Sequence, residues 1–333
     1  MLRRADPLAF APHGLLANPH LQSLLTSSPW RKLRVRKRSR AYLDRSQREV
    51  ISTPRGVHLL GYRNQAQTPN GALVILLHGW EGSSESNYLL DSSTALDRAG
   101  FATFRLNFRD HGSSHHLNPG LFHSCRLQEV LDAVGMITSA HAGEVFLAGF
   151  SLGGNFALRV ARQAPANGIE LRHVIAVSPV IRPRKVLDAL AAGWPVYEQY
   201  FVRKWRRSLK RKQQLYPERY NLESWLKLRK LADQTRQLVE DYTGFENLDA
   251  YLEGYSIAGD YLAGLTVSSL IITAADDPII PISDFHSLPR PAALELEIWK
   301  NGGHCGFLSN WRLESWIEQR IVNDLSRKLN VST

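Results

Sequence analysis

Short apolar runs alternate with longer amphipathic segments along most of the chain. Four runs are almost continuously apolar, which is typical of parallel strands that are buried on both faces. They span residues 73–77, 145–150, 173–177 and 268–275. Residues 294–299 alternate apolar with charged side chains at the period of a strand, and helical patterns cover 87–98, 124–139 and 308–328. This order predicts an α/β fold, a mostly parallel sheet with helices on both faces.

A long segment without a strand interrupts this alternation. About ninety residues separate the third apolar run from the fourth, whereas a crossover between parallel strands needs only a dozen or more. The segment is helical in pattern from about Arg184 to Tyr261 and is rich in aromatic residues. We therefore predict a helical cap at 182–263, inserted after the strand at 173–177, which is expected to be the sixth strand of the fold. The rest of the chain then divides into an N-terminal arm at 1–48 and a core at 49–181 and 264–333.

The run at 145–150 leads directly into Gly149-Phe150-Ser151-Leu152-Gly153, and a helical pattern follows. Gly-x-Ser-x-Gly between a strand and a helix is typical of a nucleophile elbow, a sharp turn that exposes the serine hydroxyl. Because the motif alone occurs by chance in many proteins, the flanking elements carry the interpretation. Ser151 is therefore the candidate nucleophile. The N–H of Leu152, at the start of the helix, is a candidate donor to an oxyanion.

A serine nucleophile needs a base and a third group that orients the base. In this architecture they follow the serine in the order Asp or Glu, then His, each after a late strand. Asp276-Asp277 follows the run at 268–275, and His304 follows the strand pattern at 294–299. We predict His304 as the base and Asp277 as the acid. Asp276 stays open as the alternative acid, because sequence does not show which of two neighbouring loop side chains faces the histidine.

The loop after 73–77 begins His78-Gly79-Trp80, at the place where this fold supplies its second oxyanion donor. We assign that donor to the N–H of Trp80, acting together with the N–H of Leu152. His78, Gly79 and Phe150 flank these two amides. They are predicted to contact the substrate.

The remaining histidines and the cysteines have simpler interpretations. His111, His115 and His116 precede the candidate nucleophile, which is the wrong chain order for its base, so they are expected to shape the rim of the pocket. Cys305 adjoins the candidate base and is expected to be a small apolar filler. With Cys125 it makes no disulfide framework and no metal-ligand spacing. Free thiols in a reducing cytoplasm are therefore expected, with no metal and no cofactor.

Further stretches resemble the YheT-like family of α/β-hydrolases. They are Asn18-Pro19-His20-Leu21-Gln22, the loop 78–86 and Asn107-Phe108-Arg109-Asp110. The resemblance extends over most of the chain and implies an α/β-hydrolase fold, a Ser151, Asp277, His304 triad and carboxylesterase or lipid-esterase activity. One departure is Asp110-His111-Gly112, where the family often has a Gly-Cys-Ser type of continuation. The rim of the pocket is therefore expected to differ.

The net charge of +10 is concentrated in two runs, 31–40 and 203–212, each with seven Lys or Arg residues and no acid. Phe201, Trp205 and Leu209 form an apolar stripe at helical period along the second run. Two interpretations of this basic amphipathic helix stay open: docking on an anionic membrane surface, or a cap helix whose stripe packs on the protein. Nucleic acid is not an expected partner, because no binding motif accompanies the charge.

The first basic run is expected to form an exposed arm or an edge strand, where charges discourage unwanted pairing. No apolar stretch approaches the roughly twenty residues of a membrane helix, and polar residues and prolines interrupt any signal-peptide core near the start. A cytoplasmic location is expected, with peripheral contact to an anionic membrane through Arg203–Lys212 as an open possibility.

Together these features predict a serine hydrolase that cleaves carboxylic esters, of medium acyl chains or of glycerolipids, through an acyl-enzyme. Two alternatives stay open. One is an acyltransferase that passes the same acyl group to an alcohol, and the other is a membrane-surface binding protein with a vestigial site. The motifs leave the substrate unassigned, because the cap and loops determine it.

Overall fold

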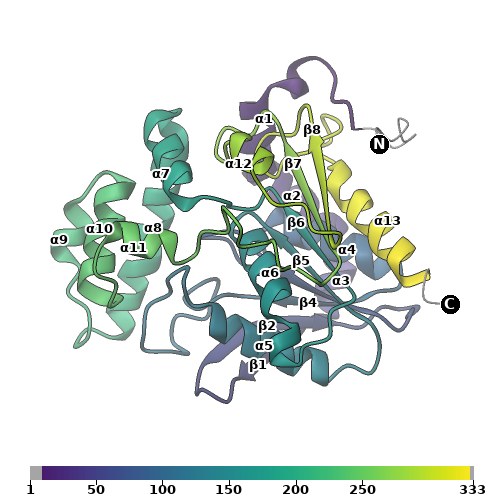
Figure 1. Cartoon of the computed structure of the whole chain (residues 1–333), viewed down its shortest axis with the longest axis horizontal. Coiled ribbons are helices and arrows are strands. Elements are labelled where there is room, and N and C mark those ends of the chain that lie inside the picture. The colour runs from purple at the N-terminus through teal and green to yellow at the C-terminus, as the bar shows by residue number, and fades with distance from the viewer. Residues whose placement is uncertain (1–9, 331–333) are drawn as a thin grey trace.

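A central sheet of eight strands organises the molecule (Figure 1). The structure is a computed structural model, and it describes residues 10–330. The strand order is β1-β2-β4-β3-β5-β6-β7-β8, with β2 antiparallel to both of its neighbours and all other pairs parallel. The strands are β1 (Gln47–Ser52), β2 (His58–Asn64), β3 (Leu73–Leu77), β4 (Ala102–Leu106), β5 (Val145–Phe150), β6 (His173–Val177), β7 (Ser269–Ala274) and β8 (Leu294–Trp299).

Helices cover both faces of this sheet, which confirms the predicted α/β fold. In the core, α4 and α13 pack together on one face, and α5 and α6 pack together on the other. The helices are α1 (Pro19–Thr26), α2 (Pro29–Arg38), α3 (Arg40–Asp44), α4 (Asn87–Arg98), α5 (Leu127–Ser139), α6 (Leu152–Gln163), α7 (Pro183–Ala192), α8 (Pro195–Leu215), α9 (Glu223–Lys227), α10 (Leu231–Tyr242), α11 (Leu248–Glu253), α12 (Ser283–His286) and α13 (Trp316–Asn330), with short 3-10 helices η1 (Gly14–Ala17) and η2 (Pro165–Asn167).

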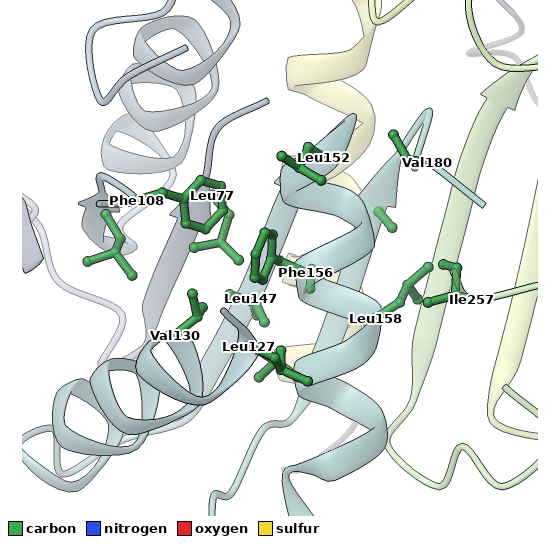
Figure 2. Packing of buried hydrophobic residues seen from close by; sticks show 14 of the residues in the cluster. Leu77, Phe108, Leu127, Val130, Leu147, Leu152, Phe156, Leu158, Val180 and Ile257 are labelled. Atoms are coloured by element: carbon green, nitrogen blue, oxygen red, sulfur yellow. The ribbon is translucent and has the colours of Figure 1, made fainter. Parts of the chain in front are cut away.

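The helix that follows the candidate serine is held by the core. Figure 2 shows Leu152 and Phe156 of α6 in one apolar cluster with Leu77 of β3 and Leu147 of β5. All four side chains are buried. The central strands are buried on both faces, because alternate residues of β3 belong to opposite clusters. This packing gives the start of α6 a rigid support.

Helices α7 to α11 lie beyond one end of the sheet, at the left of Figure 1. All five come from the segment between β6 and β7, in the region for which a helical pattern predicts a cap. The predicted boundaries of arm, core and cap stay predictions. Among the described residues, no helix combines the length and apolar character needed to cross a membrane.

The stripe on α8 packs against the protein. Trp205 and Leu209 are buried, and the ring of Phe201 stacks on that of Trp80 at 5.2 Å between centroids. One cation of the basic run is buried as well, because the Nζ of Lys212 donates to the Asp110 carboxylate at 2.6 Å. The apolar face of α8 therefore belongs to the protein interior, as in the cap-helix interpretation. Membrane contact through the exposed cations of 203–212 stays a prediction.

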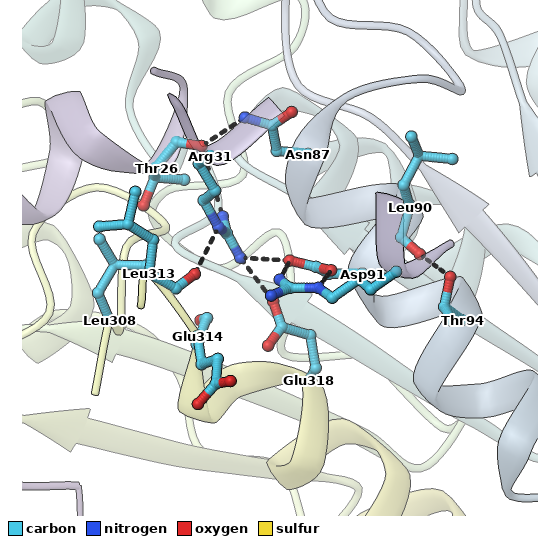
Figure 3. A network of polar contacts seen from close by, with 12 residues as sticks. Thr26, Arg31, Asn87, Leu90, Asp91, Thr94, Leu308, Leu313, Glu314 and Glu318 are labelled. Atoms are coloured by element: carbon cyan, nitrogen blue, oxygen red, sulfur yellow. Dashed lines mark hydrogen bonds and ion pairs between the residues drawn. The ribbon is translucent and has the colours of Figure 1, made fainter. Parts of the chain in front are cut away.

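The first basic run forms most of helix α2 and the start of α3, so the expectation of an exposed arm or edge strand is wrong. Arg31 is buried between α4 and α13, where it donates to Asp91 at 2.9 Å and to Glu318 at 2.7 Å (Figure 3). Arg38 donates to Asp91 as well. These carboxylates neutralise part of the basic run inside the protein. A charge pattern alone does not reveal such partners, because they lie far away in the sequence.

The last helix begins later than its pattern predicts. The pattern indicates a helix from residue 308, but α13 begins at Trp316. Leu308 forms an isolated antiparallel bridge with Ser315, so the residues between them turn back on themselves. The loop after β8 therefore extends further along the chain and reaches the N-terminal helices.

Candidate active site

The turn between β5 and α6 has the backbone of a nucleophile elbow. Ser151 adopts φ 54° and ψ −117°, a conformation that L-residues rarely adopt. Both flanking glycines are required by close backbone contacts. A Cβ on Gly149 would lie 2.1 Å from the carbonyl oxygen of Gly153, and a Cβ on Gly153 would lie 2.4 Å from that of Leu77. Any side chain at these positions would push α6 away from the sheet.

A continuous chain of hydrogen bonds joins Ser151, His304 and Asp277. The Nε2 of His304 lies 2.9 Å from the Oγ of Ser151, and its Nδ1 lies 2.9 Å from the Oδ2 of Asp277. These side chains come from the loops after β5, β8 and β7. A serine, an imidazole and a carboxylate in this order can transfer the serine proton to the imidazole while the carboxylate orients the ring.

The two adjacent aspartates have separate contacts. The side chain of Asp277 is fully buried, and its second oxygen accepts from the amides of Ile279 and Ile280 at 2.8 and 3.0 Å. Asp276 instead accepts from the amide of Gly303 at 2.9 Å. The structure therefore places Asp277 against the imidazole, whereas Asp276 holds the backbone of the loop that carries the histidine.

Helix α1 also holds that loop, a contact that the sequence analysis did not foresee. The Oγ of Ser23 accepts from the amide of His304 at 2.8 Å. Gln22 is fully buried; its Oε1 accepts from the amide of Leu308 at 2.6 Å, and its Nε2 donates to the carbonyl of Leu308 at 3.0 Å. A Cβ on Gly303 would lie 2.5 Å from the carbonyl oxygen of Pro19. The stretch 18–22, noted above only as a resemblance, begins the helix that positions His304.

The protonation of His304 depends on two opposing effects. Burial disfavours the charged imidazole, but the carboxylate of Asp277 and the neighbouring Cys305 outweigh burial and hold the pKa of His304 well above its usual value. The contact with Asp277 can therefore both orient the ring and stabilise its charged form.

Two backbone amides near Ser151 are available to a ligand. The amides on either side of Trp80 are engaged, since Gly79 donates to the hydroxyl of Tyr88 at 2.9 Å and Glu81 donates to the Nε2 of His111 at 3.1 Å. Within residues 10–330, the amides of Trp80 and Leu152 have no hydrogen-bond partner in the protein. The first N–H groups of a helix have none within it, so the amide of Leu152 also carries the favourable end of the helix dipole.

Two residues predicted to contact the substrate, His78 and Phe150, are instead buried in the protein interior. His78 is fully buried, where its Nε2 accepts from the amide of Phe108 at 3.2 Å and its Nδ1 lies 2.7 Å from the carbonyl oxygen of Gly79. Phe150 is fully buried against the ring of Tyr88. Both residues support the loops of the site, because strand ends direct alternate side chains into the core. Gly79, the third of this group, does line a cavity at the site.

The histidines expected at the pocket rim are also supporting residues. His111 is buried and holds the amide of Glu81, and burial lowers the pKa of His111 to about 4. His115 is buried against α8, where its Nε2 lies 2.8 Å from the Oγ of Ser208. The backbone carbonyl of His116 accepts from Tyr216. His111 thus supports the loop after β3, whereas His115 and His116 contact α8 and the residue that follows it.

Two cavities meet at Ser151. The larger has a volume of about 620 Å³ and is also lined by His304 and Cys305. The smaller, of about 100 Å³, is mainly apolar and is lined by Leu152 and by cap residues such as Leu238. Trp80 lines both. No group of three or more His, Cys, Asp or Glu side chains that could hold a metal ion occurs among residues 10–330.

Comparison with known proteins agrees with this geometry. The description "Alpha/beta hydrolase family" matches residues 74–313. The chain belongs to the alpha/beta hydrolase family. Within it, the chain is 25% identical to "Putative esterase YheT" of Escherichia coli (strain K12), over 97% of this chain and 95% of that protein. It is also 25% identical to human "Protein ABHD15", over 96% of this chain and 69% of that protein. The YheT-like resemblance is thereby confirmed.

Solved structures of other alpha/beta hydrolases share the fold. The esterase Pf2001 of Pyrococcus furiosus matches with a TM-score of 0.56 and 16% identity, over 85% of this chain and 91% of that one. The 2,6-dihydroxy-pseudo-oxynicotine hydrolase matches with a TM-score of 0.57 and 17% identity, over 86% of this chain and 69% of that one. At these identities the likeness shows the fold alone, because one fold serves enzymes with many different substrates.

Proposed function

We propose that this alpha/beta hydrolase cleaves carboxylic esters by two-step acyl transfer through Ser151. The observation that carries the proposal is the chain of hydrogen bonds from Ser151 through His304 to Asp277, at the junction of two cavities. The similarity to YheT supports an esterase rather than another hydrolase. The sequence-based expectation of a medium acyl chain or a glycerolipid is a finer proposal about the same site, and it competes with the shorter acyl chain that is argued below from the cavity volumes.

In the first step, the Oγ of Ser151 attacks the ester carbonyl carbon while the Nε2 of His304 takes the hydroxyl proton. The negative charge that forms on the carbonyl oxygen is stabilised by the amides of Trp80 and Leu152. The bond to the alcohol oxygen then breaks, and His304 returns the proton to that oxygen. The alcohol departs and leaves the acyl group on Ser151.

In the second step, water takes the place of the alcohol. His304 removes a proton from the water as its oxygen attacks the acyl carbon, and the same amides stabilise the second oxyanion. The bond to Ser151 breaks, His304 returns the proton to the serine oxygen, and the carboxylic acid departs. Asp277 holds the imidazole in one orientation through both steps.

Labelling with a fluorophosphonate tests the nucleophile, because this reagent phosphonylates activated serines. We expect covalent labelling of the wild type and none of Ser151→Ala, together with loss of p-nitrophenyl butyrate hydrolysis. Ser139→Ala, at the end of α5, is the matched control and should label normally. A folded wild type that neither labels nor hydrolyses the ester would refute the proposal.

A further inference from the structure

The position of His304 distinguishes the functions of the two cavities that meet at Ser151. Of the two, only the larger is lined by His304, whereas the smaller is lined by Leu152. During acylation the leaving alcohol oxygen must receive its proton from the Nε2 of His304, so the alcohol lies on the side of the imidazole. The acyl group then occupies the other side. This assignment rests on the function proposed above.

The two volumes imply a substrate whose acyl group is much smaller than its alcohol. The alcohol-side cavity, at about 620 Å³, is within the range typical of small-molecule sites. The acyl-side cavity, at about 100 Å³, is far smaller. Its walls are mainly apolar, with Leu187, Leu190 and Leu238 among them. A small apolar acyl group and a much larger alcohol fit this division.

The alcohol-side cavity carries two lysines, Lys32 of α2 and Lys204 of α8. The Nζ of Lys204 donates to the hydroxyl of Tyr200 at 3.2 Å. Throughout residues 10–330, no carboxylate lies within ion-pair distance of either lysine. Within that range, neither ammonium group therefore has a carboxylate partner that would compete with a ligand.

The acidic residues of the same cavity do not cancel this charge. Glu85 is paired with Arg36, with 2.5 Å between the guanidinium and carboxylate atoms. Burial raises the pKa of Glu81 to about 8, with Lys204 opposing the shift, so Glu81 is largely uncharged near neutral pH. The cavity is thus cationic at neutral pH, with its two positive groups on different helices.

We propose that the alcohol-side cavity recognises an anionic group, a phosphate or a carboxylate, on the alcohol of a short-chain ester, and that Lys32 and Lys204 bind this group. An oxyanion that reaches an ammonium group of this cavity can accept charge-assisted hydrogen bonds from it, and bonds of this kind are stronger than neutral ones. The bound anion holds the ester with its alcohol oxygen toward His304. The enzyme then selects its substrate by the alcohol, which is the product that departs first.

The test compares esters that share one acyl group. The probes are 1-butyrylglycerol 3-phosphate and its uncharged counterpart 1-butyrylglycerol, with 3-butyryloxypropanoate as a carboxylate probe, and the readout is butyrate release. We expect wild-type kcat/KM to be about tenfold higher for the phosphate ester than for 1-butyrylglycerol. Lys204→Ala and Lys32→Ala should each lower this ratio several-fold, mainly through KM, and the double variant should bring it close to one.

Two lysines on the same helices serve as controls, because they are exposed and do not line the cavity. Lys210→Ala on α8 and Lys37→Ala on α2 should keep the wild-type ratio. A response to phosphate but not to 3-butyryloxypropanoate would identify phosphate as the recognised anion. Hydrolysis of 1-butyrylglycerol with no preference for either anionic ester would overturn this inference and leave the proposed function intact. A wild type that hydrolyses none of the three, and does not label with fluorophosphonate, would overturn both.

Discussion

At the scale of single residues, the imidazole of His304 links the geometry of the site to its pH dependence. As the proposed base, His304 must be neutral to accept the proton of Ser151, yet Asp277 raises the pKa of His304 well above its usual value. We therefore expect kcat/KM to fall on the acidic side with a midpoint above about 6.5, since the imidazole becomes protonated as the pH drops through its raised pKa. A pH profile with p-nitrophenyl butyrate measures this midpoint.

Asp277→Asn should move that midpoint to lower pH. Without the carboxylate, burial is the main remaining effect on His304, and burial lowers its pKa. The rate should also fall by about three to four orders of magnitude, because the imidazole loses its orienting partner. Asp276→Asn keeps an oxygen that can accept from Gly303 and should retain the wild-type midpoint. An unchanged midpoint in Asp277→Asn would argue against the carboxylate as its cause.

Gln22 offers a second test at this scale, because it holds the backbone of the loop that carries His304. Gln22→Ala removes a fully buried amide and leaves the N–H of Leu308 without its acceptor. Each buried polar group left unpaired costs about 1–3 kcal/mol, so we expect a loss of that order in the free energy of unfolding, measured in urea. Gln319→Ala, an exposed glutamine on α13, should change it by less than about 0.5 kcal/mol. Equal stability of the two variants would contradict the assigned support.

How much of the site could be predicted depends on sequence distance. Ser151, Asp277 and His304 could be selected because each lies in the loop or turn after a strand, and strand patterns are local. Gln22 and Ser23 could not, because their partners lie 286 and 281 residues away. Whether a loop histidine faces the pocket or the core likewise depends on contacts with residues that lie far away in the sequence. His78, for example, is buried in the core, where it accepts from the amide of Phe108.

At the scale of elements, the basic helix α8 shows what a charge pattern leaves open. Its apolar stripe predicted a helix with one buried face, and Trp205 and Leu209 are buried as that pattern requires. The burial of Lys212 could not be foreseen, because its partner Asp110 belongs to the loop after β4. Similarly, α2 resembles an exposed basic segment until the carboxylates of α4 and α13 are placed around Arg31.

The pair of Lys212 and Asp110 should therefore fasten the cap to the core. Lys212→Ala leaves a buried carboxylate without its main partner, which typically costs about 3–5 kcal/mol in the free energy of unfolding. Lys210→Ala, two residues earlier and exposed, should cost less than about 0.5 kcal/mol. Urea denaturation measures both. A double variant with Lys212→Met and Asp110→Asn should recover part of the loss, since it removes the unpaired charge; a loss no larger in Lys212→Ala than in its control would argue against this role.

At the scale of the whole molecule, strand order determines where the site forms. β4 pairs with one side of β3 and β5 with the other, so the direction of the chain across the sheet reverses at β3. Ligand sites of open α/β sheets lie at the carboxyl ends of strands near such a reversal. The loops after β3 and β5 carry Trp80 and Ser151, and the cap closes over them with residues such as Phe201.

In the proposed function, cap residues that line the smaller cavity limit the length of the acyl group. This leads to a prediction about the chain-length preference of the whole molecule. Because the cavity proposed for the acyl group is small, at about 100 Å³, we expect a p-nitrophenyl ester series from acetate to palmitate to give the highest kcat/KM near butyrate. Leu238→Ala shortens a buried side chain of α10 that lines this cavity, so the optimum should move to longer chains.

Leu96→Ala is the matched control for this change. Leu96 is equally apolar and buried, but it lies in the cluster on the other face of the sheet and does not line the cavity. Both variants should lose about 2–5 kcal/mol of unfolding free energy, as buried leucines do when truncated, but only Leu238→Ala should change the ranking of chain lengths. A wild-type optimum at octanoate or longer would instead place the acyl chain in the larger cavity. It would favour the medium acyl chain that the sequence analysis predicts.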